Sequence, residues 1–303
     1  MRILVLGGTG FLGSHIARHL ADNGHIVTGL SRSPAGDAVV EACGAVAERG
    51  DLADPAAVIA LMRAHDATIY AAQLMLETEY ETVSALLRGV NGLDHQFLFT
   101  SGTGLLSQRT DGAWSEDSFA EDDPFAPSKY IGFRLVTETL VRQAGTSGAV
   151  RSMVVRPPMI WGNGGCGHLR MLYRDAGTSG DVGYLGAGLN LYSNVHVEDL
   201  AAVYRLALEK GAPGALYHAV AGELNNRALA QAVAADLGLT ARSIDFAEGV
   251  RRWGKFETLI GMATCSRSRA PRARRELGWT PRHHDILADV GHPAYRALAV
   301  PNS

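Results

Sequence analysis

An aromatic residue precedes a cation by four positions twice in the stretch PFAPSKYIGFRLVTETL, residues 124–140. Phe125 stands before Lys129, and Tyr130 stands before Arg134. Tyrosine carries an ionisable hydroxyl that can move a proton, whereas phenylalanine has no proton to give. The chemistry that this stretch can perform therefore depends on which of the two pairs faces a reaction site.

A second candidate site lies near the start of the sequence, where LVLGGTGFLG places Gly7, Gly10 and Gly13 three residues apart. These glycines follow a predicted strand and open a predicted helix, which is the context of a dinucleotide-binding turn. The first allows a tight turn, the next lets the backbone approach a pyrophosphate, and the third lets the helix pack against the strand. The helix N-terminus adds free N–H groups for the phosphates. The other loop residues that we assign to the cofactor are Thr9, Phe11 and Leu12.

The end of the next predicted strand, GLSRSP, indicates which dinucleotide to expect. An NAD site usually places a carboxylate there, on the ribose 2′-hydroxyl. This strand instead ends in Ser31 and Arg32 and offers no acid. The planar guanidinium of Arg32 can pair with a 2′-phosphate, so we expect NADP, with NAD less favoured. The alternative is that Arg32 is a surface arginine in a turn.

Three further strand ends supply candidate residues. Asp51 and Leu52 follow the third predicted strand and are expected to frame the adenine, although Asp51 could equally cap the helix that begins near Pro55. In open α/β sheets ligands bind beyond the carboxyl ends of the strands. We therefore assign Ala71 to the cofactor and Gln73, Ser101 and Thr103 to the substrate end of the cleft, with a simple turn of small residues as the alternative for FTSGTG.

The elements that must position these residues alternate between short apolar runs and longer helical patterns. This alternation predicts an α/β fold with a Rossmann-type doubly wound parallel sheet. The expected strands are 2–7, 25–31, 45–51, 67–72, 96–101 and 150–157, and the expected helices are 11–24, 55–64, 76–90 and 128–144. Residues 1–160 with about 193–222 are predicted to form the dinucleotide-binding domain. Residues of about 161–192 and 223–303 are predicted to form a smaller α+β substrate region.

Composition narrows the class of protein. The chain has 303 residues, of which 47% are hydrophobic and 19% charged, as in ordinary globular proteins. The net charge of -3 gives no reason to expect nucleic acid or an anionic membrane as partner. Three widely spaced cysteines, Cys43, Cys166 and Cys265, show neither metal-ligand spacing nor a disulfide framework. We therefore expect no metal and a reducing, cytoplasmic setting.

The motifs GGTGFLG, GDLAD, TSGTG, VVRPPMIWG, NVHVEDLA and RARRELGWTP occur in this order along almost the whole chain. Taken together, they make the chain resemble the extended short-chain dehydrogenase/reductases, the NAD(P)-dependent epimerase/dehydratase group. The resemblance implies a Rossmann domain, a smaller C-terminal region that closes over the nicotinamide end, and a homodimer through the helices near 76–90 and 128–144. It also implies catalysis by a Ser or Thr, a Tyr and a Lys.

The resemblance favours one of the two aromatic–cation pairs. In such enzymes a helix carries Tyr-x-x-x-Lys, usually with Glu four residues after the cation. Counting from Arg134 reaches Glu138, whereas counting from Lys129 reaches Phe133. We therefore place Tyr130 and Arg134 at the catalytic positions, with Ser101 orienting the substrate oxygen and Thr103 in reserve. The pair that begins at residue 125 stays as the alternative.

Arginine in place of lysine is a departure that bears on mechanism. A cation one helical turn away lowers the pKa of tyrosine, which is ordinarily about 10. Arg134 can supply that charge and bond a ribose, but it does not release a proton, so a relay through the cation would be impaired. The resemblance also implies that Trp161 and His168, in the loop after RPPMI, border the substrate.

These inferences predict an NADP(H)-dependent oxidoreductase, either a reductase/dehydrogenase or an epimerase, that acts on a carbonyl or secondary alcohol of a small-molecule substrate. Two alternatives remain open at this point. One is an NADP-binding sensor whose catalytic residues have drifted, and the other is a non-redox isomerase or cyclase on the same scaffold. The sequence does not identify the substrate.

Overall fold

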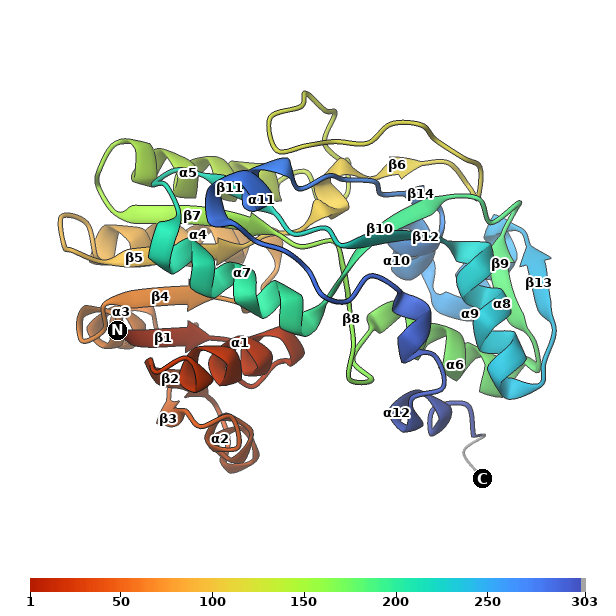
Figure 1. The fold of residues 1–303 in the computed structure, drawn as a ribbon, viewed down its shortest axis with the longest axis horizontal. Helices are drawn as coiled ribbons and strands as arrows, with labels where there is room; N and C mark the ends of the chain where they lie inside the picture. The colour runs from red at the N-terminus through yellow and green to blue at the C-terminus, as the bar shows by residue number, and fades with distance from the viewer. Residues whose placement is uncertain (301–303) are drawn as a thin grey trace.

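The protein's main body is a parallel sheet, shown with the rest of the chain in Figure 1, a computed structural model that describes residues 1–300. Seven strands lie in the order β11-β7-β5-β4-β1-β2-β3, and every neighbouring pair is parallel. The predicted Rossmann-type doubly wound sheet is therefore confirmed. The strands are β1 Arg2–Leu6, β2 Ile26–Ser31, β3 Val46–Arg49, β4 Ala67–Tyr70, β5 Gln96–Thr100, β7 Arg151–Arg156 and β11 Leu216–His218.

Helices cover both faces of this sheet. Ile3 and Val5 of β1 pack on one face, and Leu4 and Leu6 pack on the other, because successive side chains of a strand point to opposite sides. The first face is covered by α1 Phe11–Asp22, α2 Pro34–Glu41, α7 Val197–Lys210 and α11 Pro271–Leu277. The second is covered by α3 Pro55–Arg63, α4 Leu76–Gly89 and α5 Arg134–Thr146. Among the described residues, no helix is long and apolar enough to cross a membrane.

The strand order creates the position of the site. β1 pairs with β2 on one side and with β4 on the other, so the chain changes direction across the sheet at this point. Ligands of open α/β sheets bind in the crevice beyond the carboxyl ends of the strands at such a switch point. The predicted glycine loop follows β1 directly, so it lies at the entrance to this crevice.

A second hydrophobic core lies in the C-terminal part of the structure, on the right in Figure 1. It draws buried side chains from segments 159–192 and 229–295. The predicted division into two domains stays a prediction. The elements around this core are β8 Met159–Trp161, α6 Gly167–Ser179, β9 Val182–Leu185, β10 Leu191–His196, β12 Gly222–Asn225, α8 Asn226–Leu237, β13 Ala241–Ile244, α9 Phe246–Trp253, α10 Lys255–Glu257, η2 Thr258–Met262, β14 Thr264–Cys265, η3 Ile286–Asp289 and α12 Pro293–Arg296.

The predicted helix over 128–144 is wrong at its start, because α5 begins only at Arg134. The preceding residues form turns, in which the N–H of Ser128 donates to the Leu105 carbonyl at 3.1 Å and the N–H of Ile131 donates to the Ser128 carbonyl at 3.3 Å. Gly132 closes this turn tightly, since a Cβ there would lie 2.7 Å from the Ser128 carbonyl oxygen. A tertiary contact therefore replaces the first helical turn.

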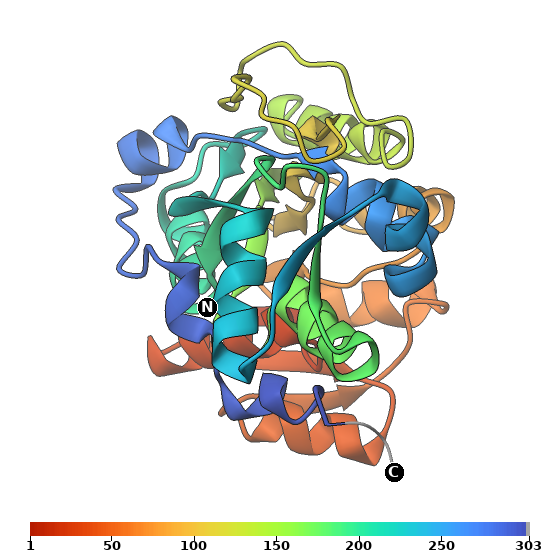
Figure 2. The same ribbon diagram turned by 90° about the vertical axis from the view of Figure 1, so that its right-hand side faces the viewer.

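The long excursion between β6 (Gln108–Arg109) and α5 arches over the top of the molecule, in yellow in Figure 2. Arginines of the C-terminal segment hold it in place. Arg269 pairs with Asp123 at 2.7 Å, Arg272 pairs with Asp122, and Arg267 donates to the Ser115 carbonyl at 3.1 Å. These ion pairs and hydrogen bonds join segments about 150 residues apart in the sequence.

Candidate active site

A cavity of about 640 Å³, here called the main cavity, runs along the carboxyl ends of the sheet strands. Most of the predicted site residues line it, and their roles in binding or catalysis stay predictions. The predicted residues in its lining are Gly7, Thr9, Gly10, Phe11, Leu12, Arg32, Asp51, Leu52, Ala71, Gln73, Ser101, Thr103, Arg134 and His168. Lining residues to which the sequence reasoning gave no role include Leu30, Gly50, Pro157, Pro158, Met159 and Tyr192.

The glycine loop forms one end of the main cavity. Gly7 has a φ of +88°, and a Cβ on it would lie 2.7 Å from the Ala71 carbonyl oxygen. A Cβ on Gly13 would lie 2.1 Å from the Gly7 carbonyl oxygen, so only glycine lets α1 approach the loop this closely. Gly10 is the N-cap of α1 and has no side chain to bond the first-turn amides. The loop thus presents backbone N–H groups in a space that fits a pyrophosphate.

Arg32 stands at the edge of the same end of the cavity. Its side chain is 79% exposed, and its Nη1 lies 3.9 Å from Oδ2 of Asp51. Ser31 is buried beside it and donates a hydrogen bond to the Ser33 carbonyl at 3.0 Å, so it does not line the cavity. The capping alternative for Asp51 is wrong, because Asp54 is the N-cap of α3 and accepts from the Ala57 N–H at 3.1 Å.

Two buried hydroxyl groups lie at the other end of the cavity. Ser101 is 6% exposed and Thr103 is 1% exposed, and neither hydroxyl has a hydrogen-bond partner within the described part of the chain. Their backbone is fixed, since the N–H groups of Ser101 and Thr103 donate to the carbonyls of Val155 and Pro157 at 2.8 and 2.9 Å. Leaving a buried hydroxyl unpaired costs about 1–3 kcal/mol, so both groups are suited to bonding a ligand.

Arg134 enters the main cavity beside these hydroxyls and is held from behind by Glu79 of α4. Nη2 of Arg134 donates to Oε2 of Glu79 at 2.9 Å, and the Glu79 carboxylate is fully buried. Burial raises the pKa of Glu79, and the Arg134 charge opposes that rise. Burial likewise raises the pKa of Tyr70, whose hydroxyl has no partner among residues 1–300.

Glu79 was missed by the sequence reasoning, although a signal was present. It occupies a position on the buried face of α4, which also carries Val83, Leu86 and Leu87. A carboxylate at a core position of a helix requires a partner because burying an unpaired charge is costly. The structure shows that the partner is the cation of the proposed catalytic pair.

Tyr130 does not join this group. Tyr130 is 41% exposed, and it does not line the main cavity. The Lys129 ammonium lies 5.0 Å from the centroid of its ring. The expectation that Tyr130 and Arg134 share one helical face is wrong, because the helix starts at Arg134. Phe125 is no substitute, since it packs against Phe119 with ring centroids 6.3 Å apart. The proton-transfer role of Tyr130 therefore stays a prediction that the geometry does not support.

The register of α5 does agree with the predicted frame. Glu138, four residues after Arg134, is buried and accepts a hydrogen bond from Nε of Arg156 at 2.8 Å. This pair joins α5 to β7 and so fixes the rotation of the helix. The same rotation turns Arg134 toward Glu79 and the main cavity.

His168 and Tyr192 line the main cavity and also a second cavity of about 700 Å³. His168 lies at the start of α6 rather than in a loop, and its ring centroid is 5.1 Å from that of Tyr192. Burial lowers the pKa of His168 to about 4, so its imidazole is neutral near pH 7. Nε2 of His168 is buried and has no partner among the described residues.

Trp161 does not border either cavity, contrary to the prediction. Its indole is buried and donates to Oδ1 of Asn194 at 2.9 Å. The same ring packs edge-on against His196, with the ring centroids 4.7 Å apart. This side chain therefore joins β8 to β10 and has a packing role in the structure.

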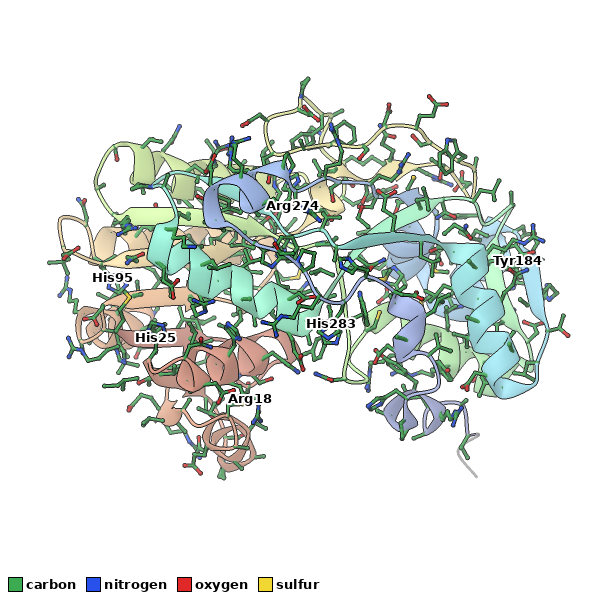
Figure 3. All side chains as sticks on the ribbon, viewed as in Figure 1. Arg18, His25, His95, Tyr184, Arg274 and His283 are labelled. Atoms are coloured by element: carbon green, nitrogen blue, oxygen red, sulfur yellow. The ribbon has the colours of Figure 1, made fainter. Side chains whose placement is uncertain are left out.

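The structure also brings together three residues of metal-ligating types that the sequence did not group. Ligand atoms of His196, Glu198 and His283 all lie within 4.8 Å of one another, and Figure 3 shows His283 between the two halves of the molecule. Some of the ring nitrogens of these histidines already have polar partners. Nδ1 of His196 accepts from the Glu198 N–H at 3.3 Å, and Nδ1 of His283 lies 3.1 Å from Oδ2 of Asp199. The cluster lines neither cavity.

The chain matches one protein-family model and several known proteins in sequence. Residues 3–220 match the NAD dependent epimerase/dehydratase family. An uncharacterized protein of Schizosaccharomyces pombe is 30% identical, with 97% of this chain and 100% of that protein covered. A decarboxylating sterol-4-alpha-carboxylate 3-dehydrogenase of Dictyostelium discoideum is 26% identical, with 73% of this chain and 71% of that enzyme covered.

Comparison with solved structures supports the fold. A dTDP-glucose 4,6-dehydratase of Bacillus anthracis, in complex with NAD, superimposes with a TM-score of 0.76 at 17% identity. The match covers 99% of this chain and 95% of the dehydratase. At 17% identity the likeness shows a shared fold and carries no information about the substrate.

Proposed function

Because the chain belongs to the NAD dependent epimerase/dehydratase family, we propose that it is an NADP(H)-dependent oxidoreductase acting on a carbonyl or secondary alcohol of a small metabolite. One observation carries the proposal. A single cavity is lined by the glycine loop and by Ser101 and Thr103, whose buried hydroxyls have no hydrogen-bond partner among the described residues. A cavity of this kind accommodates a dinucleotide at one end and a polar reacting group at the other.

The residues present fit a nicotinamide dinucleotide. A Cβ on Gly7 or Gly13 would fill space at the glycine loop, and no side chain caps the first-turn N–H groups of α1. Arg32 would bond the 2′-phosphate of NADP, and Arg134 would bond a ribose hydroxyl through guanidinium N–H groups that Glu79 does not use. When bound, the cofactor supplies or accepts the hydride.

Ser101 and Thr103 are proposed to hold the substrate oxygen. The backbone of both residues is anchored by hydrogen bonds to Val155 of β7 and to Pro157, so this part of the chain does not have to be ordered when substrate binds. Arg134 adds a fixed positive charge beside them, which favours negative charge developing on that oxygen.

The proton source is the part of the proposal that needs the sharpest test. We keep Tyr130 as the candidate because it stands four residues before Arg134. In this role the turn of residues 129–133 has to carry the phenol from the surface into the cavity. The test is Tyr130→Phe against Tyr192→Phe, because Tyr192 is the tyrosine that lines the cavity. Loss of turnover in Tyr130→Phe with unchanged NADPH affinity would support the role, and unchanged turnover would contradict it.

The activity itself is tested by following NADPH oxidation with a panel of ketones, aldehydes and nucleotide sugars. Substrate-dependent oxidation that Ser101→Ala lowers by about 10²-fold, without weakening NADPH binding, would support the proposal. Product analysis of the active substrate distinguishes reduction from epimerisation, since an epimerase returns the cofactor unchanged.

The choice of NADP over NAD has its own test in Arg32→Asp. Removing the guanidinium and adding a carboxylate at the 79% exposed edge should weaken NADPH binding by about 10²-fold and leave NADH binding equal or stronger. Isothermal titration with both cofactors measures this. Equal losses for NADPH and NADH would remove the argument for NADP.

A second candidate function is an NADP-binding sensor without turnover. The position of Tyr130 outside the cavity favours it, as does arginine in place of the family's lysine. A sensor would bind NADPH tightly, show no oxidation with the whole panel, and change its protease susceptibility on binding.

The expected homodimer and the cytoplasmic setting remain proposals. Phe133 and Val136, at the start of α5, expose 40% and 46% of their surface and offer an apolar contact for a second copy. Sedimentation of the wild type and of Val136→Glu would test that contact.

A further inference from the structure

The second cavity adjoins the main cavity and has a distinct chemical character. Its volume is about 700 Å³, and it lies between α6 and the segment from α9 to η2. His168 and Tyr192 line both cavities, so the second begins where the main one ends. A substrate whose oxygen contacts Ser101 can therefore extend past His168 into this space.

One part of the lining is apolar. Met171, Trp253, Ile260 and Met262 contribute to it, and Phe256 adds a ring that is 63% exposed. Covering this surface with the body of a ligand would remove apolar area from water, which contributes about 25 cal/mol per Å². The cavity thus favours a hydrocarbon or aromatic segment.

The rest of the lining is polar and carries more arginines than carboxylates. Arg252 is neutralised, because it pairs with Asp175 at 2.6 Å and with Asp181 at 2.7 Å. The side chains of Arg174 and Arg251 are exposed and have no hydrogen-bond or ion-pair partner among residues 1–300, and the exposed Glu257 lines the same cavity. Arginines that line a cavity and lack a carboxylate partner match the two oxygens of an incoming carboxylate.

The local charge also differs from that of the whole chain. Four arginines and two carboxylates line the second cavity, whereas the chain carries a net charge of -3. At the junction with the main cavity, the buried Nε2 of His168 has no partner among the described residues.

We propose that the second cavity binds the part of the substrate remote from the reacting carbon, and that this part is an apolar body ending in a carboxylate. The apolar wall holds the body, and Arg174 with Arg251 bonds the carboxylate. This inference rests on the proposed function, because it takes the main cavity as the place of reaction.

Direct binding tests the anion site without requiring turnover. The probes are 2-naphthoate and its neutral analogue 2-naphthalenemethanol, titrated calorimetrically into the NADPH-saturated protein. We expect the naphthoate to bind at least tenfold more tightly than the alcohol. The double variant Arg174→Gln with Arg251→Gln should lose at least tenfold in naphthoate affinity and little in affinity for the alcohol.

The matched control is Arg275→Gln, which removes an exposed arginine of α11 that pairs with Glu276 and lines neither cavity. It should leave both affinities unchanged. Equal binding of the two probes to the wild type, or a double variant that binds naphthoate as tightly as the wild type, would overturn the anion site.

Turnover separates this inference from the proposed function. NADPH oxidation is measured with 6-formyl-2-naphthoate and with 2-naphthaldehyde. A lower KM for the formyl acid, lost in the double variant, supports both. Naphthoate binding that depends on the two arginines, without reduction of either aldehyde by NADPH, supports the anion site and counts against oxidoreductase action on these aldehydes. Reduction of both aldehydes with the same KM overturns the anion site alone.

Discussion

The two ends of the main cavity are built in different ways. The glycine-loop end is made by consecutive residues between β1 and α1, and its contacts come from backbone atoms. The strand end is made by Ser101, Thr103 and Arg134, with Glu79 behind Arg134, and these residues come from three separate stretches of the chain. The first end therefore depends on the absence of side chains, and the second on their exact pairing.

Hydrogen-bond satisfaction shows the same difference. Some of the unpartnered buried side-chain atoms of the described residues lie at the strand end, on Ser101, Thr103, Arg134, Glu79 and Tyr70. The glycine loop contributes no side-chain atom to that group, and its Gly10 N–H donates to the Gly7 carbonyl at 2.9 Å. The loop therefore leaves only backbone N–H groups open, whereas the strand end leaves side-chain atoms without partners among residues 1–300.

The largest expected effect comes from placing a side chain in the loop. In Gly13→Ala the new Cβ would lie 2.1 Å from the Gly7 carbonyl oxygen, so α1 has to move away from the loop. We expect NADPH binding to be lost and unfolding free energy to fall by about 1–3 kcal/mol. Fluorescence titration and thermal unfolding measure the two quantities.

Gly238→Ala is the control for the stability part of this effect. Gly238 has a φ of +67° at the end of α8, and a Cβ there would meet no atom within 4 Å. It should cost about 1 kcal/mol through backbone strain and leave NADPH affinity intact. Equal NADPH affinity in both variants would show that the loop is not the cofactor site.

A smaller effect is expected from breaking the pairing at the strand end. In Glu79→Gln the guanidinium of Arg134 loses its charged partner at 2.9 Å while keeping its own charge. We expect about tenfold lower turnover and weaker NADPH binding, because the guanidinium is no longer held in one position. Steady-state kinetics with NADPH as the varied substrate gives both values.

Arg134→Lys sharpens this prediction. Lysine restores the residue usual in the family and still pairs with Glu79, so it should retain or raise turnover, whereas Arg134→Ala should lose about 10²-fold. If Glu79→Gln behaves as the wild type, the ion pair serves folding only, and the contrast between the two ends becomes weaker.

The last effect is confined to acid pH and concerns the stability contributed by His168. Burial lowers its pKa from 6.5 to about 4, so between these pH values the unfolded chain binds a proton that the folded chain does not. Stability should therefore fall as the pH drops from 6.5 to 4, by up to about 3 kcal/mol from this group. His168→Phe should show a shallower fall in urea unfolding over the same range. Parallel curves for the two proteins would mean that His168 is not desolvated as the structure indicates.

The predictions that held were those based on local patterns. The spacing of Gly7, Gly10 and Gly13 after an apolar run is enough to place a strand, a turn and a helix, and the structure has all three. Ser101 and Thr103 reach the cavity because they follow a buried parallel strand, and strand ends of such a sheet share one edge.

The predictions that failed depended on contacts between distant segments. A helical pattern suggested that α5 starts before Tyr130, but the hydrogen bond from Ser128 to Leu105 holds that stretch in a turn. Trp161 was expected to border the substrate, but its indole donates a hydrogen bond to Asn194 on a neighbouring strand. The sequence pattern around Ser128 does not indicate Leu105 as a partner, and the pattern around Trp161 does not indicate Asn194.

The sequence by itself indicated the strand segments of the sheet, the glycine loop and the spacing of Glu138 from Arg134, because each depends on residues within a few positions of one another. Tertiary structure alone decided that Glu79 supports Arg134, that Tyr130 stays at the surface, and that Arg174 and Arg251 line one cavity. The physical reason is that side-chain pairing and burial are set by which elements pack together. That packing minimises the free energy of the whole chain, so no single segment fixes it.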